Sequence, residues 1–87
     1  MVLGLPGHTP GSIALHLPRH GVLITGDTVA EHQGQAILGP FSTDRAQAWA
    51  DLQRLAALNV AVACPGHGDL IRPDAAAALR RATDPFA

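Results

Sequence analysis

The stretch SIALHLPRHGVLITGD, residues 12–27, decides the fold because it predicts two strands joined by a tight turn. Large apolar side chains recur at every second position of its first half, at Ile13, Leu15 and Leu17. That period of two predicts a strand whose buried face carries these three side chains. Residues 18–21 supply the turn, and Val22 to Thr25 form a continuous apolar run that predicts a second strand covered on both faces.

The rest of the chain predicts one further strand and two helices. Residues 29–42 contain Gly and Pro without a clear hydrophobic period, which predicts a loop. Residues 43–59 predict a helix, residues 60–63 a buried strand, and residues 74–82 an alanine-rich helix. The first helix has one apolar stripe, formed by Ala48, Trp49, Leu52, Leu55 and Ala56. Asp44 and Gln47 resemble a capping box at its start, and Asn59 is expected to close its end.

The order strand-strand-loop-helix-strand-helix predicts the α/β class. The chain has 87 residues, which is enough for one domain. Two of its strands are nearly continuous apolar runs, and the two helices offer little cover for both faces of a sheet. We therefore expect residues 1–87 to form a single partial domain, one part of a larger α/β structure with exposed sheet edges.

Composition argues against several classes of partner. The net charge is -1 and lysine is absent, so the basic surface of a nucleic-acid-binding protein is missing. No apolar run approaches the roughly 20 residues that span a membrane, and the first residues lack the pattern of a signal peptide. The single cysteine excludes an internal disulfide. We expect a cytoplasmic protein that binds neither nucleic acid nor membranes, and exposed sheet edges that permit self-association.

Three polar residues lie beside predicted strands, each next to Gly or Pro. His8 precedes the first strand, Asp27 follows the second, and His67 follows the third within Pro-Gly-His-Gly. Two imidazoles and a carboxylate are ligand types that hold zinc, manganese or iron. Glycine permits sharp turns and close backbone approach at such a site. Spacing alone is consistent with a metal site and also with three unrelated turn residues.

A nucleophilic triad is the alternative that the chain order raises. Ser12, Asp27 and His67 occur in the order Ser-Asp-His, as in α/β-hydrolases. A strand follows Ser12, whereas the nucleophile of those enzymes needs a strand-to-helix elbow, so the sequence disfavours a triad. The other histidines are expected at the surface: His16 on the face opposite the apolar side chains, and His20 and His32 in turns or loops. Cys64 is expected to be a small apolar filler.

The segments PGHTPGSIALHLPRHGVLITGD and CPGHGDLI together resemble the C-terminal half of the metallo-β-lactamase superfamily, most closely its glyoxalase II-like metallo-hydrolases. The resemblance implies half of an αββα sandwich with two metal ions at one rim, expected to be zinc, with manganese or iron as alternatives. It also implies that His8 and His67 each bind one ion and that Asp27 bridges both as the catalytic carboxylate. The family motif H-x-H-x-D-H, which supplies most other ligands, is absent from this sequence.

The resemblance implies hydrolysis of a small-molecule thioester, ester or lactone by a metal-bound hydroxide. Because the upstream ligands are missing, the chain alone is expected to bind two metals weakly and to be inactive by itself. The alternative is a truncated, catalytically inactive paralogue or structural fragment with weak metal binding. The substrate-binding residues are not identified by the sequence.

Overall fold

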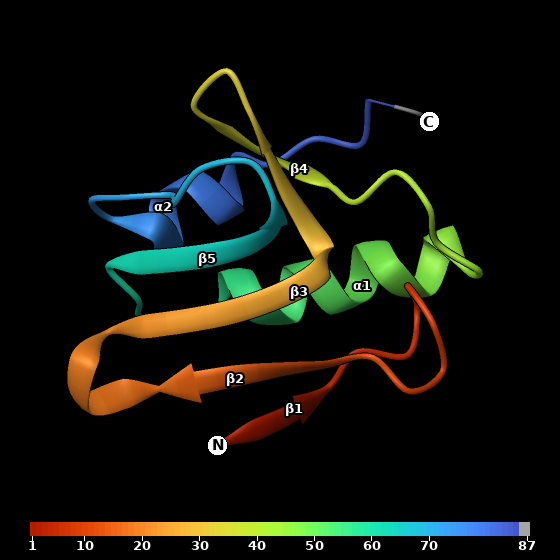
Figure 1. Cartoon of the computed structure of the whole chain (residues 1–87), viewed down its shortest axis with the longest axis horizontal. Coiled ribbons are helices and arrows are strands. Elements are labelled where there is room, and N and C mark those ends of the chain that lie inside the picture. Colours follow the sequence, from red (N-terminus) through yellow and green to blue (C-terminus); the bar gives the residue numbers. More distant parts are fainter. Residues whose placement is uncertain (86–87) are drawn as a thin grey trace.

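The computed structural model describes residues 1–85 and shows a five-stranded sheet with two helices (Figure 1). The elements in chain order are β1 (Val2–Gly4), β2 (Ile13–Leu17), a 3-10 turn (Pro18–His20), β3 (Val22–His32), β4 (Gln35–Leu38), α1 (Arg45–Ala56), β5 (Val62–His67) and α2 (Ala75–Arg80). Strands β1, β2, β3 and β4 are antiparallel neighbours in that order, and β5 pairs with β3 in parallel. The α/β class and the β2–β3 hairpin predicted by the sequence are confirmed.

Strand β3 is long and changes partners along its length. Its first residues pair with both β2 and β5, whereas Val29 to His32 pair with β4. The register of the β3–β5 pair shifts at Gly26, whose φ of 58° places it in the left-handed region. A bulge of this kind bends a strand and redirects the side chains that follow it. Asp27 therefore lies in the middle of β3, not after the end of a strand as the sequence analysis expected.

The prediction of a loop over residues 29–42 is wrong for its first ten residues. They contain the end of β3 and all of β4, joined by a two-residue turn at Gln33 and Gly34. Both turn residues have positive φ, 52° and 80°, as a tight hairpin turn requires. Asn or Asp commonly occupies the first of these positions, and Gln33 there conceals the hairpin signal. The short edge strand β1 was also missed, because three residues are too few to show a period.

The prediction of which face of β2 is buried is wrong. Ile13, Leu15 and Leu17 are 50%, 38% and 41% exposed, while Ala14 and His16 are buried. Both helices lie on the Ala14 and His16 side of the sheet (Figure 1). A period of two separates two faces of a strand but does not say which face another element covers. His16, expected at the surface, is 9% exposed, so that expectation is also wrong.

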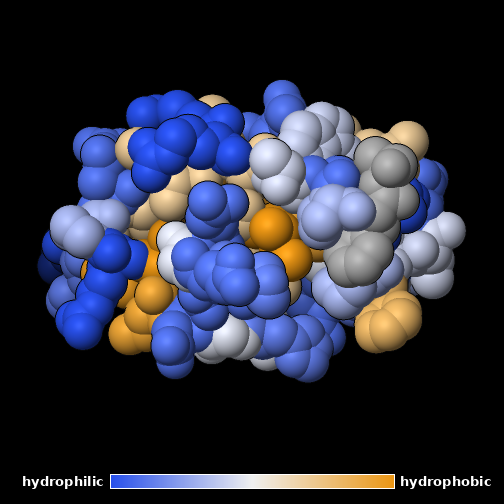
Figure 2. Space-filling view, turned by 90° about the horizontal axis from the view of Figure 1, so that it is seen from above, coloured by the Kyte–Doolittle hydropathy of each residue, from blue (hydrophilic) through white to orange (hydrophobic). Residues whose placement is uncertain are grey.

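The uncovered face of the sheet is apolar across neighbouring strands. Leu15 pairs with Val2 on one side and Ile24 on the other, and Ile24 pairs in turn with Cys64 of β5. Val2 and Ile24 are 61% and 39% exposed, and Cys64 is half-buried. A different side of the molecule, seen from above in Figure 2, also has orange hydrophobic residues at the surface between blue hydrophilic ones. An exposed apolar sheet face of this kind indicates a surface that another layer covers.

The core lies between the helices and the other face of the sheet. Leu23 and Ala63 of the sheet pack with Leu52 and Leu55 of α1 and Leu79 of α2, all of them essentially unexposed. No helix among residues 1–85 is long and apolar enough to cross a membrane.

Both predicted helices are present, with ends that differ by a few residues. The Asp44 side chain caps α1 by accepting a hydrogen bond from the Gln47 backbone N–H at 3.1 Å, as expected. The C-terminal cap of α1 is Ala57, whose N–H bonds the carbonyls of Arg54 and Leu55, so Asn59 does not close the helix as expected. The Asp74 side chain accepts from the Ala77 N–H at the start of α2.

Candidate metal centre

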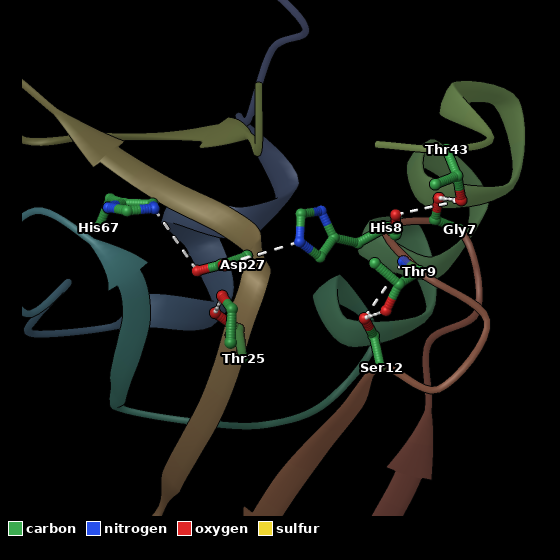
Figure 3. A network of polar contacts seen from close by, with 9 residues as sticks. Gly7, His8, Thr9, Ser12, Thr25, Asp27, Thr43 and His67 are labelled. Atoms are coloured by element: carbon green, nitrogen blue, oxygen red, sulfur yellow. Dashed lines mark hydrogen bonds and ion pairs between the residues drawn. The ribbon is translucent and has the colours of Figure 1, made fainter. Parts of the chain in front are cut away.

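The loop between β1 and β2 carries His8 and is fixed to the start of α1. The backbone N–H of Asp44 donates to the Gly7 carbonyl, and that of Thr43 donates to the His8 carbonyl, each at 2.9 Å. The Thr43 hydroxyl also donates to the His8 carbonyl at 3.2 Å (Figure 3). Gly7 lies so close to α1 that a Cβ on it would be 2.1 Å from the backbone nitrogen of Ala48. The first Pro-Gly-His therefore needs glycine for contact with a helix.

Asp27 lies at the β3 bulge, enclosed by backbone from two other segments. A Cβ on Gly66 would be 2.0 Å from Asp27 Oδ1, and one on Gly39 would be 1.9 Å from the Asp27 carbonyl oxygen. The second Pro-Gly-His therefore uses its glycine to make room for the Asp27 carboxylate. Both Pro-Gly-His motifs thus allow a close contact that places a candidate ligand.

His67 is the last residue of β5 and pairs with Ala30 of β3. The turn after it is held by Glu31, whose side chain accepts from the backbone N–H of Asp69 at 2.9 Å and from that of Gly34 at 2.6 Å. The backbone hydrogen bond from Asp69, and then that from Gly34, lower the pKa of Glu31 below 4.5. Glu31 thus connects the β3–β4 turn to the segment that follows His67.

The three candidate ligands meet at one rim of the sheet, with Asp27 in the middle (Figure 3). His8 Nε2 is 3.6 Å from Asp27 Oδ2, and His67 Nε2 is 3.6 Å from Asp27 Oδ1. The side chains of His8, Asp27 and His67 are 17%, 48% and 69% exposed. Each carboxylate oxygen therefore faces a different imidazole nitrogen, and the site is open to solvent on the His67 side.

The donor set fits a divalent metal ion on each side of Asp27. A nitrogen and an oxygen that bind one zinc ion at roughly 2.0–2.2 Å lie about 3.3–3.6 Å apart. The observed separations are at the upper end of this interval. Within residues 1–85, no group of three or more His, Cys, Asp or Glu side chains is close enough to enclose a single ion. His8 Nδ1 is buried and has no hydrogen-bond partner among residues 1–85, so no group in this part of the chain sets the tautomer of His8.

The structure does not assemble the Ser-Asp-His alternative. The Ser12 hydroxyl pairs with the Thr9 hydroxyl at 2.6 Å and accepts from the Thr9 N–H, which closes the His-Thr-Pro-Gly-Ser turn upon itself. Ser12 thus shapes the turn after His8, while Asp27 and His67 face each other across β3 and β5 (Figure 3). Of the remaining histidines, His20 and His32 are exposed, as the sequence analysis expected.

Glu31 and Asp51 are polar residues near the site that the sequence analysis did not single out. Glu31 was assigned to a loop, where a carboxylate has no expected partner. Asp51 is fully buried on α1 and accepts a hydrogen bond from the Gly7 N–H. Its position carried a usable signal, because it follows Ala48 by three residues and precedes Leu55 by four, which places it on the buried helix face.

Comparison with known proteins places this rim in a family. The family model described as Metallo-beta-lactamase superfamily matches residues 1–67. The chain belongs to the metallo-beta-lactamase superfamily. A hydroxyacylglutathione hydrolase from Fuscovulum blasticum is 39% identical over 69 residues, which are 77% of this chain. The chain spans only 26% of the length of that relative.

Two solved structures show the same fold in other superfamily proteins. The metallo-beta-lactamase family protein TTHA1429 from Thermus thermophilus is 31% identical, with a TM-score of 0.68 over 92% of this chain and 27% of that protein. TTHA1623, solved in a di-iron-bound form, is 30% identical, with a TM-score of 0.70 over all of this chain and 42% of that protein. The chain thus corresponds to less than half of each relative.

Proposed function

We propose that this chain supplies the metal-binding rim of a hydrolase that cleaves a small-molecule thioester. The observation that carries the proposal is the Asp27 carboxylate, which presents one oxygen to each of two imidazoles on separate segments. The similarity to a hydroxyacylglutathione hydrolase supports the thioester over an ester or a lactone. Because the chain spans a minor part of its relatives, we propose residues 1–87 as one part of a larger catalytic domain.

The roles of the residues follow from where each side chain lies. A bound divalent metal supplies a water that ionises near neutral pH and a Lewis acid for the substrate carbonyl. His8 and His67 would each offer Nε2 to one ion, and Asp27 would hold the two ions at a fixed separation. The largely buried His8 side chain would hold its ion in a fixed position, while the exposed His67 side would leave room for the substrate.

We propose zinc as the metal, with iron and manganese as alternatives. Two nitrogen donors and one oxygen donor suit all three ions, and zinc prefers imidazole and carboxylate at low coordination number. The di-iron form of TTHA1623 supports iron as the principal alternative. The test is titration of the metal-free chain with each ion, followed by metal analysis of the chain purified without added metal.

A non-catalytic metal-binding paralogue is the second candidate. One observation favours it: residues 1–85 contain no group of three or more His, Cys, Asp or Glu side chains that could hold one ion. Under this candidate the rim binds one ion weakly and the chain does not turn over substrate. The two candidates therefore agree on metal binding and differ in hydrolysis.

Metal binding is tested with single variants of the three ligands. We expect His8→Ala and His67→Ala each to lower zinc affinity, and Asp27→Ala to lower it most, because both ions lose a ligand. The matched control is His20→Ala, which removes an exposed histidine from the turn before β3. Equal zinc affinity in Asp27→Ala and in the parent chain, measured by isothermal titration, would contradict the ligand assignment.

Hydrolysis is tested with hydroxyacylglutathione, a simple ester and a lactone, each with the zinc-loaded product of the full natural gene, because residues 1–87 alone are expected to be inactive. Turnover of the thioester that disappears in Asp27→Ala supports the hydrolase. Zinc binding without turnover of any of the three substrates supports the non-catalytic paralogue. Turnover confined to the ester or lactone would reject the thioester as the substrate class.

We also propose a cytoplasmic location and a small-molecule substrate, without nucleic-acid or membrane partners. The single cysteine, the absence of lysine and the net charge of -1 support these assignments. Self-association is proposed through the uncovered face of the sheet. Fractionation of cells that express the natural gene tests the location.

A further inference from the structure

A fully buried carboxylate lies behind the His8 loop, outside the group of candidate ligands. Asp51 is on α1 with 0% of its surface exposed, and it is the only carboxylate among the buried side chains of residues 1–85. A buried charge is costly unless hydrogen bonds compensate it. We propose that Asp51 is a positioning residue that sets the location of the His8 imidazole relative to Asp27. This inference rests on the proposed metal-binding function of that rim.

The Asp51 carboxylate is hydrogen-bonded on both oxygens. Oδ2 accepts from the Gly7 backbone N–H at 2.9 Å. Oδ1 accepts from the Gln47 side-chain amide at 2.9 Å and from the Arg54 guanidinium at 3.4 Å. Gln47 and Arg54 thus orient the carboxylate from its own helix, and the remaining oxygen faces the loop.

Hydrogen bonds therefore hold the Gly7–His8 segment at three backbone groups that are close together along the chain. Asp51 binds the Gly7 N–H, and the backbone N–H groups of Asp44 and Thr43 bind the carbonyls of Gly7 and His8. All three partners belong to α1 or to the two residues before it. The segment cannot move closer to α1, because Gly7 already contacts the backbone of Ala48. The contact with Ala48 therefore prevents the loop from moving toward α1, and the three hydrogen bonds prevent it from moving away.

The position of Asp51 explains why a polar side chain occupies an apolar helix face. An apolar residue there would fill the same volume but leave the Gly7 N–H buried without an acceptor. The carboxylate acts on a peptide group directly adjacent to His8, so a change at Asp51 is transmitted to the imidazole through one residue. Groups that orient a ligand in this way commonly change metal affinity by about 10- to 100-fold when removed.

The experiment compares Asp51→Leu, which removes the acceptor, with Asp51→Asn, which keeps an oxygen for the Gly7 N–H. Gln53→Ala is the matched control on the same helix, because Gln53 is exposed and takes part in none of the hydrogen bonds described above. The first readout is zinc affinity from competition with a chromophoric chelator. The second is the NMR signals of the His8 and His67 rings in the metal-free chain, with circular dichroism to verify folding.

We expect Asp51→Leu to weaken zinc binding by about 10- to 100-fold and to shift the His8 ring signals while those of His67 stay unchanged. The zinc affinity of Asp51→Asn should remain within about threefold of that of the parent chain, because Asn keeps an oxygen that accepts the hydrogen bond from the Gly7 N–H. Unchanged His8 signals in folded Asp51→Leu would overturn the proposal. So would equal losses in Asp51→Leu and Asp51→Asn.

The native chain provides a test that does not depend on any variant. Hydrogen exchange should show the Gly7 amide protected as strongly as the amides of α1, because it is bonded to a buried carboxylate. Exchange of Gly7 at the rate of an exposed amide would overturn the proposal. A parent chain that binds no zinc would reject the proposed function, whereas the His8 signals and the Gly7 exchange would still report on positioning.

Discussion

Two glycines determine where the candidate ligands lie, and both do so by lacking a side chain. Gly7 permits contact between the His8 loop and α1, and Gly66 permits contact between β5 and the Asp27 carboxylate. Neither has a φ in the left-handed region, so close approach, rather than an unusual backbone conformation, requires glycine at both positions. The chemistry of the rim thus depends on residues that cannot bind a metal themselves.

Gly66→Ala should displace Asp27 without removing any ligand. The new Cβ would overlap Asp27 Oδ1 and approach the Asp27 backbone within 2.9 Å, so we expect a loss of about 1–3 kcal/mol in stability. Zinc affinity should fall as well, as measured by titration. Gly11→Ala is the control, because its Cβ would meet open space. Parent-like zinc affinity in Gly66→Ala would show that the contact with Asp27 is not required.

Glu31 should make stability depend on pH in the acidic range. Its pKa in the folded chain is lowered below 4.5 by backbone hydrogen bonds from Asp69 and Gly34, so the ionised form stabilises the folded state. That contribution is fully present above about pH 4.5, the value of the unfolded chain, and is lost as the pH falls through the lower folded value. Glu31→Gln should therefore be less stable than the parent near neutral pH and should lose this difference in acid.

The pKa of Glu31 is simple to measure, because Glu31 is the only glutamate in the sequence. Carbon NMR of a chain labelled at glutamate gives one carboxyl signal, whose titration reports the folded pKa directly. Denaturant unfolding of parent and Glu31→Gln across the same pH range gives the stability difference. A midpoint at or above 4.5 would contradict the hydrogen bonds to Glu31.

At the scale of elements, α1 both covers the sheet and anchors the His8 loop. Asp44 takes part in both functions: its side chain caps the helix, and its backbone N–H bonds the Gly7 carbonyl. Asp44→Ala removes only the first contact. We expect it to lower the free energy of unfolding by about 1 kcal/mol and to leave zinc affinity unchanged. A loss of zinc affinity at unchanged stability would show instead that the Asp44 side chain acts on the site.

The sequence allowed prediction of the elements that have strong local signals. The β2–β3 hairpin and both helices have periodic or capped patterns, and all are present. The strand predicted at residues 60–63 is present as β5 but spans Val62–His67, so His67 ends this strand and does not follow it. The strand β4 was missed because Gln33 conceals a tight turn. The buried face of β2 was reversed because large apolar side chains were taken to face the core, whereas the helices pack over Ala14 and His16.

For the candidate site too, the sequence predicted features that depend on local patterns and missed contacts between distant segments. Residue types and spacing singled out His8, Asp27 and His67, and the structure brings Asp27 close to both histidines. Their role as metal ligands stays a prediction. The Glu31–Asp69 and Asp51–Gly7 hydrogen bonds join segments that are distant in sequence, so no local pattern indicates these two contacts, although helical spacing places Asp51 on the buried face of α1.

At the scale of the whole molecule, no helix or strand among residues 1–85 covers one face of the sheet. Side chains of β1, β2 and β3 form this apolar face, with Cys64 of β5 beside them. The molecule measures 31 × 28 × 19 Å, so the face has room for about 800 Å² of contact, the area each partner buries in a standard interface. A second copy of the chain presents the same apolar surface and can cover it.

We therefore expect the isolated chain to self-associate through this face at high concentration. Leu15→Glu, at the centre of the face, should increase the monomer fraction in sedimentation experiments, because a buried unpaired charge opposes association. Phe41→Glu is the control: it changes another exposed apolar residue, which lies in the loop before α1. Equal monomer fractions in the parent and in Leu15→Glu would exclude this face and leave the edge strand β1 as the proposed contact.

The parallel pairing of β3 with β5 has a consequence for how the protein matures. Asp27 and His67 are brought together by two parallel strands that are separated along the chain by β4 and α1. Long-range parallel contacts of this kind form slowly compared with local helices. A cation that binds at the rim as we propose should therefore report completion of the fold. During refolding its spectroscopic signal should lag behind the helical signal, and higher cation concentrations should protect more of the chain from proteolysis.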